Sequence, residues 1–335
     1  MENIYLKIHF FIKNFIFLKL LKLMMHMFCI KRLIPLKLKQ LSVGLIVLLL
    51  SQVYCIAQDK TTGQPLIISF DRAIVNSPPV SYGFNPFYKK YADAFGIPII
   101  SSEKVSDDAL LIARDIINYM LLKRPDIRAG MIKLGARLSI IGKSEMQTDL
   151  PECHDWKKPT YDDGRLTPGE RENYYKPGGI ASMTDHGYWD QRARGMGGIQ
   201  TSCAEENLLG YPGTRYFGEN IMVHEFSHNI MAVLETIDAD MIKQINAAYE
   251  NAKDKGLYKG QYAINTVAEY WAEGTQWWFW SNIEFYDGGM RIQSPDDLKA
   301  YDPVLYNILD KVYAGHHIPG DVYYGKNLNN NTSKR

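Results

Sequence analysis

The segment Ile221-Met222-Val223-His224-Glu225-Phe226-Ser227-His228-Asn229-Ile230 contains the pattern HExxH and decides how the rest of the chain is interpreted. Residues four apart lie on one face of a helix, so His224 and His228 can present their imidazoles to one metal ion. Glu225 follows the first histidine and can reach a water on that ion without being a ligand. The alternative is a fortuitous match in an ordinary structural helix. Because apolar residues flank the motif, and neither Pro nor Gly interrupts residues 219–238, we predict a buried zinc-binding helix.

A catalytic zinc site needs a third protein ligand, and the residues next to the motif do not supply one. In the metzincin pattern a Gly and then a third His follow the second His at intervals of three residues. Met231 and Leu234 occupy those positions here, which excludes that class. Glu250 lies further along, but its polar surroundings indicate a solvated side chain. The third ligand is therefore expected beyond this region.

A better source is the aromatic-rich segment 265–280, which reads as a mostly buried helix. Glu269 and Glu273 stand four residues apart on one face of it. Burying two carboxylates requires a cation or strong hydrogen-bond donors, whereas an exposed polar stripe would require neither. We favour the first interpretation, with one acid as a zinc ligand and the other accepting the free N–H of a ligating histidine.

The two segments resemble the helices of the gluzincin metallopeptidases, in which a second helix carries a Glu ligand. HExxH and the segment Glu269-Tyr270-Trp271-Ala272-Glu273 look most like the branch that contains the anthrax lethal factor catalytic domain. The resemblance covers only a modest part of the chain. It implies one zinc ion per chain, Glu225 as general base, and Glu269 as the acid that supports a ligating histidine. The zinc ligands that it implies are His224, His228 and Glu273.

One position departs from that branch, which carries a transition-state-stabilising Tyr two turns before its Glu ligand. This chain has Thr266 there. Tyr262 lies one further turn back on a similar helical face, and Tyr270 is the other candidate. A Tyr hydroxyl at this place would donate a hydrogen bond to the developing oxyanion. We assign that catalytic role to Tyr262, because Tyr270 is more simply explained as a core residue.

The predicted fold is α+β: a zincin-like domain in which a small mixed sheet backs the HExxH helix and a second, Glu-bearing helix. An edge strand is expected within Gly195–Ser202, where glycines would let an extended substrate pair with the main chain; a plain glycine loop is the alternative. Ser106 is expected to cap a helix. The other expected strands lie at 66–70, 131–132 and 138–141, and the other expected helices at 84–96, 109–122 and 303–312.

Residues 1–57 are interpreted as a signal peptide or leader: a Lys-rich start, an apolar block over Leu41–Leu50, and cleavage after Ala57. An uncleaved anchor and a later translation start are the alternatives. Cleavage would make the protein secreted, either extracellular or periplasmic. The rest is divided into three parts: 58–150, the N-terminal α/β part of the catalytic unit; 151–325, the zinc-binding catalytic region; and 326–335, a disordered tail.

Removal of the leader would leave two cysteines, Cys153 and Cys203. An even pair in an exported chain favours one disulfide, with two free thiols as the alternative. The chain between them is rich in Gly, Pro and polar residues. Its acidic and imidazole side chains are interpreted as turn or surface residues, with a structural calcium site as the alternative: His154, Asp155, Asp162, Asp163, Asp185 and His186.

A net charge of +1, with acids and bases balanced, gives no electrostatic reason to expect nucleic-acid binding. We therefore predict an exported zinc-dependent hydrolase, a metallopeptidase that acts on peptides or proteins and meets membranes only through an uncleaved leader. One alternative is a non-catalytic exported binding protein on a gluzincin scaffold. Another is a zinc amidohydrolase with a non-peptide substrate. The sequence carries no signal for an oligomeric state.

Overall fold

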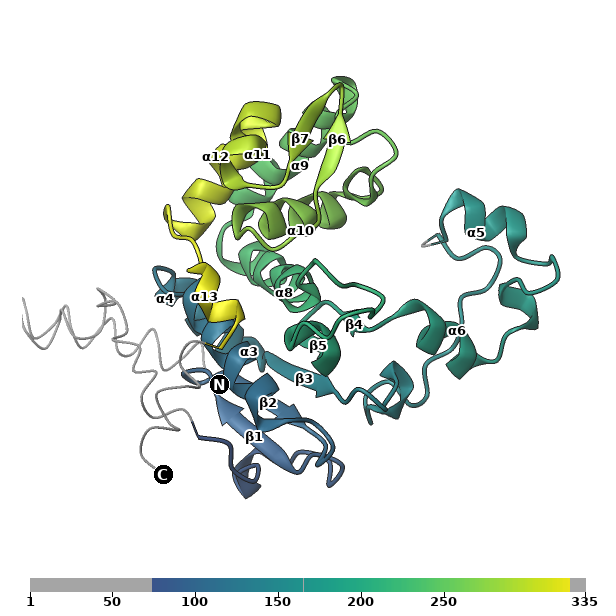
Figure 1. The fold of residues 1–335 in the computed structure, drawn as a ribbon, viewed down its shortest axis with the longest axis vertical. Coiled ribbons are helices and arrows are strands. Elements are labelled where there is room, and N and C mark those ends of the chain that lie inside the picture. Colours follow the sequence, from purple (N-terminus) through teal and green to yellow (C-terminus); the bar gives the residue numbers. More distant parts are fainter. Residues whose placement is uncertain (1–73, 165, 326–335) are drawn as a thin grey trace, which may run out of the picture. The chain divides into compact units, whose positions relative to one another are not determined.

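The computed structural model describes residues 74–164 and 166–325. The predicted leader, the strand at 66–70 and the tail at 326–335 lie outside the described residues. The described part has an α+β fold, in which helices pack against a five-stranded mixed sheet, with a smaller two-stranded sheet beside α10 and α11 (Figure 1). No helix in it is both long and apolar enough to cross a membrane.

The main sheet has the spatial order β1-β2-β3-β5-β4. Its three central strands run parallel, and each outer strand is antiparallel to its neighbour. The edge strand predicted within Gly195–Ser202 is therefore confirmed as β4, and the strand predicted at 138–141 as β3. The strands of this sheet are Lys90–Asp93 (β1), Pro98–Ser101 (β2), Arg137–Ile141 (β3), Gly195–Met196 (β4) and Gln200–Ala204 (β5); the small sheet pairs Phe285–Asp287 (β6) with Met290–Ile292 (β7).

Helices supply the remaining regular structure. The α-helices are Asp107–Met120 (α3), Pro125–Leu134 (α4), Pro168–Asn173 (α5), Asp185–Arg192 (α6), Glu205–Leu208 (α7), Ile221–Ile237 (α8), Ala239–Asp254 (α9), Val267–Trp278 (α10), Pro295–Tyr301 (α11), Pro303–Tyr313 (α12) and Gly320–Tyr323 (α13). Short 3-10 helices cover Val80–Tyr82 (η1), Gln147–Asp149 (η2), Ile180–Ser182 (η3) and Tyr262–Ile264 (η4). The predicted cap is present, because the Ser106 side chain accepts from the Asp108 N–H at the start of α3.

The helices pack on one face of the main sheet, α3 against β1 and β2 and α8 against β5. Alternation along β3 explains this: Leu138 and Ile140 belong to the large core with α8, whereas Ile141 packs in a smaller cluster on the other face. α10 then packs on α8, and the fully buried Trp271 donates from Nε1 to the Ser227 carbonyl at 2.9 Å. These contacts hold the helix with the two acids against the HExxH helix.

Two predicted elements are wrong. Residues 84–96 do not form a helix, because residues 90–93 instead pair with β2 along four residues. A tight turn follows β1, in which Phe95 and Gly96 have φ of 52° and 90° and Asp93 Oδ1 accepts from the Gly96 N–H. The strand expected at 131–132 lies inside α4, which begins with Pro125 in its first turn and ends at Gly135 in the left-handed conformation.

The predicted disulfide is also wrong: Cys153 and Cys203 are both buried free thiols. The reason is the alternation of side chains along β5. Cys203 pairs in register with Ile140 and belongs to the large core beneath α8. Cys153 packs with Ile141 on the opposite face of the sheet. The main sheet therefore separates the two sulfur atoms.

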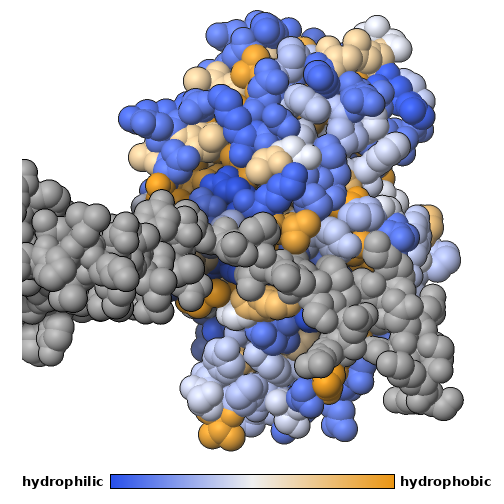
Figure 2. All heavy atoms as spheres, turned by 90° about the vertical axis from the view of Figure 1, so that its left-hand side faces the viewer, coloured by the Kyte–Doolittle hydropathy of each residue, from blue (hydrophilic) through white to orange (hydrophobic). Residues whose placement is uncertain are grey.

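The β3–β4 connection, residues 142–194, contains η2, α5, η3 and α6 and extends away from α8 and α10 (Figure 1). It has a small aromatic cluster of its own, which includes Tyr174, Tyr188 and Trp189. Elsewhere the large exposed apolar side chains are scattered, and the face in Figure 2 shows them in small groups among hydrophilic residues where grey atoms do not cover it. The aromatic cluster of the connection is thus separate from the large core beneath α8.

Candidate active site

α8 brings the three HExxH residues together. Asn220 caps the helix by accepting from the Val223 N–H, so the regular turns begin directly before the motif. Ligand atoms of His224, Glu225 and His228 all lie within 4.8 Å of one another. His224 is buried, and the other two are partly buried. The two imidazoles and the carboxylate that the sequence placed on one helical face therefore converge at one point.

The first turn of α10 carries Glu269 to the same point. The Thr266 side chain caps this helix and accepts from the Glu269 N–H at 3.2 Å. Glu269 Oε2 then lies 3.0 Å from His224 Nε2 and 3.8 Å from His228 Nε2. One carboxylate oxygen thus faces the Nε2 atoms of both motif histidines.

Glu273 lies one turn later and approaches His224 from its other side. Its Oε1 is 3.4 Å from His224 Nδ1, and its Oε2 accepts from Asn282 Nδ2 at 2.8 Å. Gln276, which the sequence reasoning missed, places Oε1 3.0 Å from the same Nδ1. The recurrence of polar residues at 269, 273 and 276 along one face of an aromatic helix was the signal that could have found it. Two different sets of α10 groups therefore serve the two nitrogens of His224.

These donor atoms fit a zinc ion. Zn–N and Zn–O bonds of about 2.0–2.1 Å in a tetrahedron place the donor atoms roughly 3.3 Å apart. The separations from Glu269 Oε2 to the two Nε2 atoms, 3.0 and 3.8 Å, lie on either side of that value. Glu225 Oε2 is further from His228 Nε2, at 4.0 Å. Two imidazole nitrogens and one carboxylate oxygen are also a donor set that zinc accepts.

The acids around His224 control the charges of the site. Burial alone disfavours a charged His224, but the adjacent carboxylates of Glu269 and Glu273 outweigh it and hold the His224 pKa well above 6.5. Burial, followed by repulsion from His224, lowers the pKa of His228 to about 4. Burial opposes charge on Glu269 as well, yet the hydrogen bond to His224 lowers its pKa. Without metal, His224 therefore carries the proton that a cation would displace.

Glu225 has the environment of a general base. Burial raises its pKa from 4.5 to about 7, with His224 lowering it and the nearby acids raising it. Because the best proton acceptors have a pKa near the working pH, this carboxylate is suited to accept and release a proton at neutral pH. Burial, followed by the charge of Glu273, also raises the pKa of Glu219. Glu225 and Glu219 therefore keep their protons to higher pH than exposed glutamates do.

The two Tyr candidates have different places. Tyr262, in η4, is 50% exposed, and its ring centroid lies 6.3 Å from that of His224. Burial of its hydroxyl and then the charge of Glu269, to which it hydrogen-bonds, raise its pKa. Tyr270 is fully buried and donates to Asp302 Oδ2 at 2.7 Å. Tyr262 therefore borders the site, whereas Tyr270 belongs to the core.

The β4–β5 hairpin lies directly against the HExxH helix. A Cβ on Gly197 would lie 2.5 Å from His228 Cδ2, and one on Gly195 would lie 3.1 Å from Glu225 Cγ. Only glycine permits this approach of backbone to side chain. The hairpin glycines therefore place the edge of the main sheet beside the candidate metal ligands.

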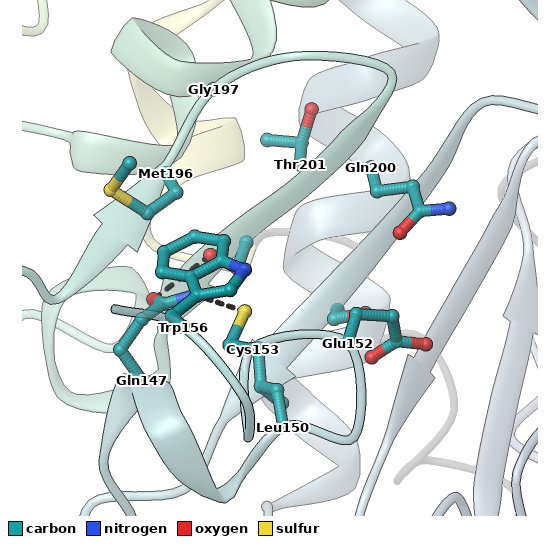
Figure 3. A pocket seen from close by; sticks show the side chains of 11 residues that line it. Gln147, Leu150, Glu152, Cys153, Trp156, Met196, Gly197, Gln200 and Thr201 are labelled. Atoms are coloured by element: carbon teal, nitrogen blue, oxygen red, sulfur yellow. Dashed lines mark hydrogen bonds between the residues drawn. The ribbon is translucent and has the colours of Figure 1, made fainter. Parts of the chain in front are cut away.

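A cavity of about 160 Å³ borders the same hairpin on the other face of the sheet (Figure 3). Gln147 accepts from Ser202 Oγ and donates to Cys153 Sγ at its base, and Trp156 and Met196 form part of its wall. Gly197 lines this cavity and also contacts His228. The hairpin thus separates the cavity from the candidate metal ligands.

The imidazoles and acids of the β3–β4 connection serve local structure. His186 Nε2 lies 2.8 Å from the His154 carbonyl oxygen, and Asp185 Oδ1 accepts from the Lys158 N–H. Among the described residues, the cluster with metal-ligand spacing is the one in α8. The prediction that the imidazole and acidic residues between Cys153 and Cys203 are turn or surface residues agrees with these contacts.

No protein-family model and no curated protein matches this chain. Among solved structures, it is similar to "Structure of the PRO-PRO endopeptidase (PPEP-2) from Paenibacillus alvei", with a TM-score of 0.39 and 16% sequence identity. The match covers 64% of this chain and 96% of that chain.

Proposed function

We propose that the protein is a zinc-dependent metallopeptidase in which Glu225 is the general base. The observation that carries the proposal is the approach of one Glu269 oxygen to the Nε2 atoms of both motif histidines, 3.0 Å from one and 3.8 Å from the other. The ligands that we propose are His224, His228 and Glu269.

This assignment exchanges the two acids relative to the sequence-based prediction, which made Glu273 the ligand. Glu273 faces His224 Nδ1, the nitrogen on the opposite side of the ring from Glu269. A single imidazole binds a metal through one nitrogen and offers the other as a hydrogen-bond donor. The exchange also resolves the departure at Thr266, because the position two turns before Glu269 is Tyr262.

The chain's own groups then have defined tasks in peptide hydrolysis. A bound zinc ion would polarise the substrate carbonyl and lower the pKa of a water. Glu225 takes the proton of the attacking water and delivers it to the leaving amine. The Tyr262 hydroxyl is protonated at neutral pH, and burial and Glu269 raise its pKa further; it donates to the developing oxyanion.

The position of β4 favours an extended peptide as the substrate. β4 is the outer strand of the main sheet and pairs with β5 on one side only. An extended chain can add to such an edge through main-chain hydrogen bonds. Because Gly195 and Gly197 hold this strand against Glu225 and His228, a peptide paired with β4 would pass directly beside the base and one ligand.

Metal content and peptide cleavage test the proposal. The full-length protein is expected to contain about one zinc per chain and to cleave members of a mixed peptide library. Glu269→Ala is expected to lose the metal, and Glu273→Ala to retain most of it. If Glu273→Ala loses zinc and Glu269→Ala retains it, Glu273 is the third ligand, as the sequence-based prediction had it. A wild-type protein that binds zinc but cleaves neither peptides nor small amides would favour a binding protein.

The export predicted from residues 1–57 stays a prediction, because that segment lies outside the described residues. The resemblance to the anthrax lethal factor branch also stays a prediction. A library in which cleavage is confined to small non-peptide amides would support the amidohydrolase alternative instead.

A further inference from the structure

Gln276 is fully buried on α10, two turns beyond Glu269, and its amide contacts the candidate metal ligand His224. Its Oε1 lies 3.0 Å from His224 Nδ1, and its Nε2 donates to the Asn220 carbonyl oxygen at 3.1 Å. Burying an amide requires that its donors and acceptors be satisfied. This one bridges the N-cap of α8 and the first histidine of HExxH.

The chemistry of its neighbours determines which way the amide points. A backbone carbonyl only accepts, so the side facing Asn220 must be the NH₂ group. The same NH₂ group also meets the carboxylate of Glu219, with which Gln276 hydrogen-bonds. With two acceptors on the NH₂ side, the oxygen is left facing His224. It can therefore only accept, and Nδ1 must carry the hydrogen.

Glu273 is the competing acceptor for the same N–H. Its Oε1 lies 3.4 Å from Nδ1, which is beyond the usual hydrogen-bond range, whereas the Gln276 distance falls within it. Its other oxygen is already held by Asn282 Nδ2 at 2.8 Å. The distances therefore favour the amide over the carboxylate as the partner of Nδ1–H.

We propose that Gln276 is a positioning residue that accepts Nδ1–H of His224 and so directs the Nε2 lone pair toward the metal. The inference rests on the proposed zinc site but not on peptide cleavage. The Gln276 NH₂ group is bonded to the Asn220 carbonyl, and this bond keeps the amide oxygen directed at His224. One side chain therefore links the start of α8 to the orientation of the proposed ligand. Substitution of such supporting groups typically weakens metal binding roughly 10–100-fold.

Nuclear magnetic resonance of full-length protein with ¹⁵N-labelled histidine tests the proposal. In wild type, the Nδ1–H proton of His224 is expected as a slowly exchanging resonance, in the zinc-loaded protein and in the metal-free protein. Gln276→Met keeps the side-chain length and removes the acceptor; it should make that resonance exchange rapidly and raise the zinc Kd roughly 10- to 100-fold.

Two controls make the test decisive. Gln244→Met, on the exposed part of α9, should change neither the resonance nor the zinc affinity, and circular dichroism checks that each variant is folded. Glu273→Gln should leave the Nδ1–H resonance in place even where its lost charge weakens zinc binding. If Glu273→Gln abolishes the resonance and Gln276→Met does not, Glu273 is the acceptor and the proposal is overturned. Because the metal-free spectrum reports the same bond, absence of peptidase activity leaves this result interpretable.

Discussion

The helix pair α8–α10 and the β3–β4 connection both contain histidines and acids, but these side chains do different work. In the helix pair, His224 contacts Glu269, Glu273 and Gln276, and all four come from regular turns at fixed spacing. In the connection, His186 contacts the His154 carbonyl and supports a loop. The residue type alone therefore does not predict a metal site; the regular spacing of residues along a helix is also needed. The following experiments test whether this contrast is functional.

The largest expected effect is the loss of activity in Glu225→Gln. Removing a general base costs roughly 10²- to 10⁴-fold in rate, and zinc should remain bound because Glu225 is not a proposed ligand. Initial rates on a cleaved library peptide, with zinc content measured on the same sample, check this. The matched change in the connection, His186→Gln, should leave both values as in wild type. Undiminished hydrolysis by Glu225→Gln would remove Glu225 from the mechanism.

Stability should differ between the regions as well. Trp271 is fully buried between α10 and α8, so Trp271→Ala is expected to lower the free energy of unfolding by about 3–5 kcal/mol. Trp189 is 8% exposed in the small cluster of the connection, and Trp189→Ala should cost less and increase proteolysis within residues 142–194. Urea unfolding and limited proteolysis measure the two effects. Equal losses would mean that the connection belongs to the main core.

The pH dependence of the metal-free protein gives a third, smaller effect. The pKa of Glu225 is 4.5 when unfolded and about 7 when folded, because burial disfavours its charge. Between these values the folded protein keeps a proton that the unfolded chain has lost, so this residue's contribution to stability falls as pH rises from 4.5 to about 7.

Glu225→Gln removes that contribution and should stabilise the metal-free protein at pH 8 by about 1–3 kcal/mol relative to its effect at pH 4. Thermal unfolding with a chelator present measures the difference. A variant whose stabilisation is the same at both pH values would contradict the raised pKa of Glu225.

The smallest expected effect is that of a reductant, which should leave the melting temperature unchanged because both cysteines are free. Burial raises the pKa of Cys153 to about 11 and also raises that of Cys203 well above its usual 9. Native alkylation should therefore be slow, and faster at Cys153, which lies in the connection, than at Cys203 beneath α8. Mass spectrometry after timed alkylation checks this. Faster labelling of Cys203 than of Cys153 would mean that the core beneath α8 opens more readily than the β3–β4 connection.

The sequence predicted those parts of the fold and site in which chemistry imposes a spacing. HExxH required a helix with two histidines on one face, and α8 provides it. Ser106, followed by two acids, predicted the start of α3. Which acid faces Nε2 was not predictable from residue type, because Glu269 and Glu273 share one helical face and only the position of α8 distinguishes them.

Predictions failed where tertiary pairing outweighed local pattern. The apolar spacing in 84–96 is compatible with a helix, yet residues 90–93 gain main-chain partners in β2. In α4, Pro125 in the first turn and Gly135 at the end mark a helix, and the apolar pair Met131-Ile132, which predicted a strand, lies within it. The disulfide failed because cysteine counting carries no information about which face of a sheet each thiol occupies.

The contact between Gly197 and the His228 ring limits how this protein can be re-engineered. Any library that randomises the β4–β5 hairpin to alter substrate choice will displace His228, a candidate metal ligand, whenever it places a side chain at 197. Met196 points to the opposite face of the sheet, in register with Ser202, and can be varied without meeting α8. A designer should therefore diversify Met196 and the cavity wall while holding the two hairpin glycines constant.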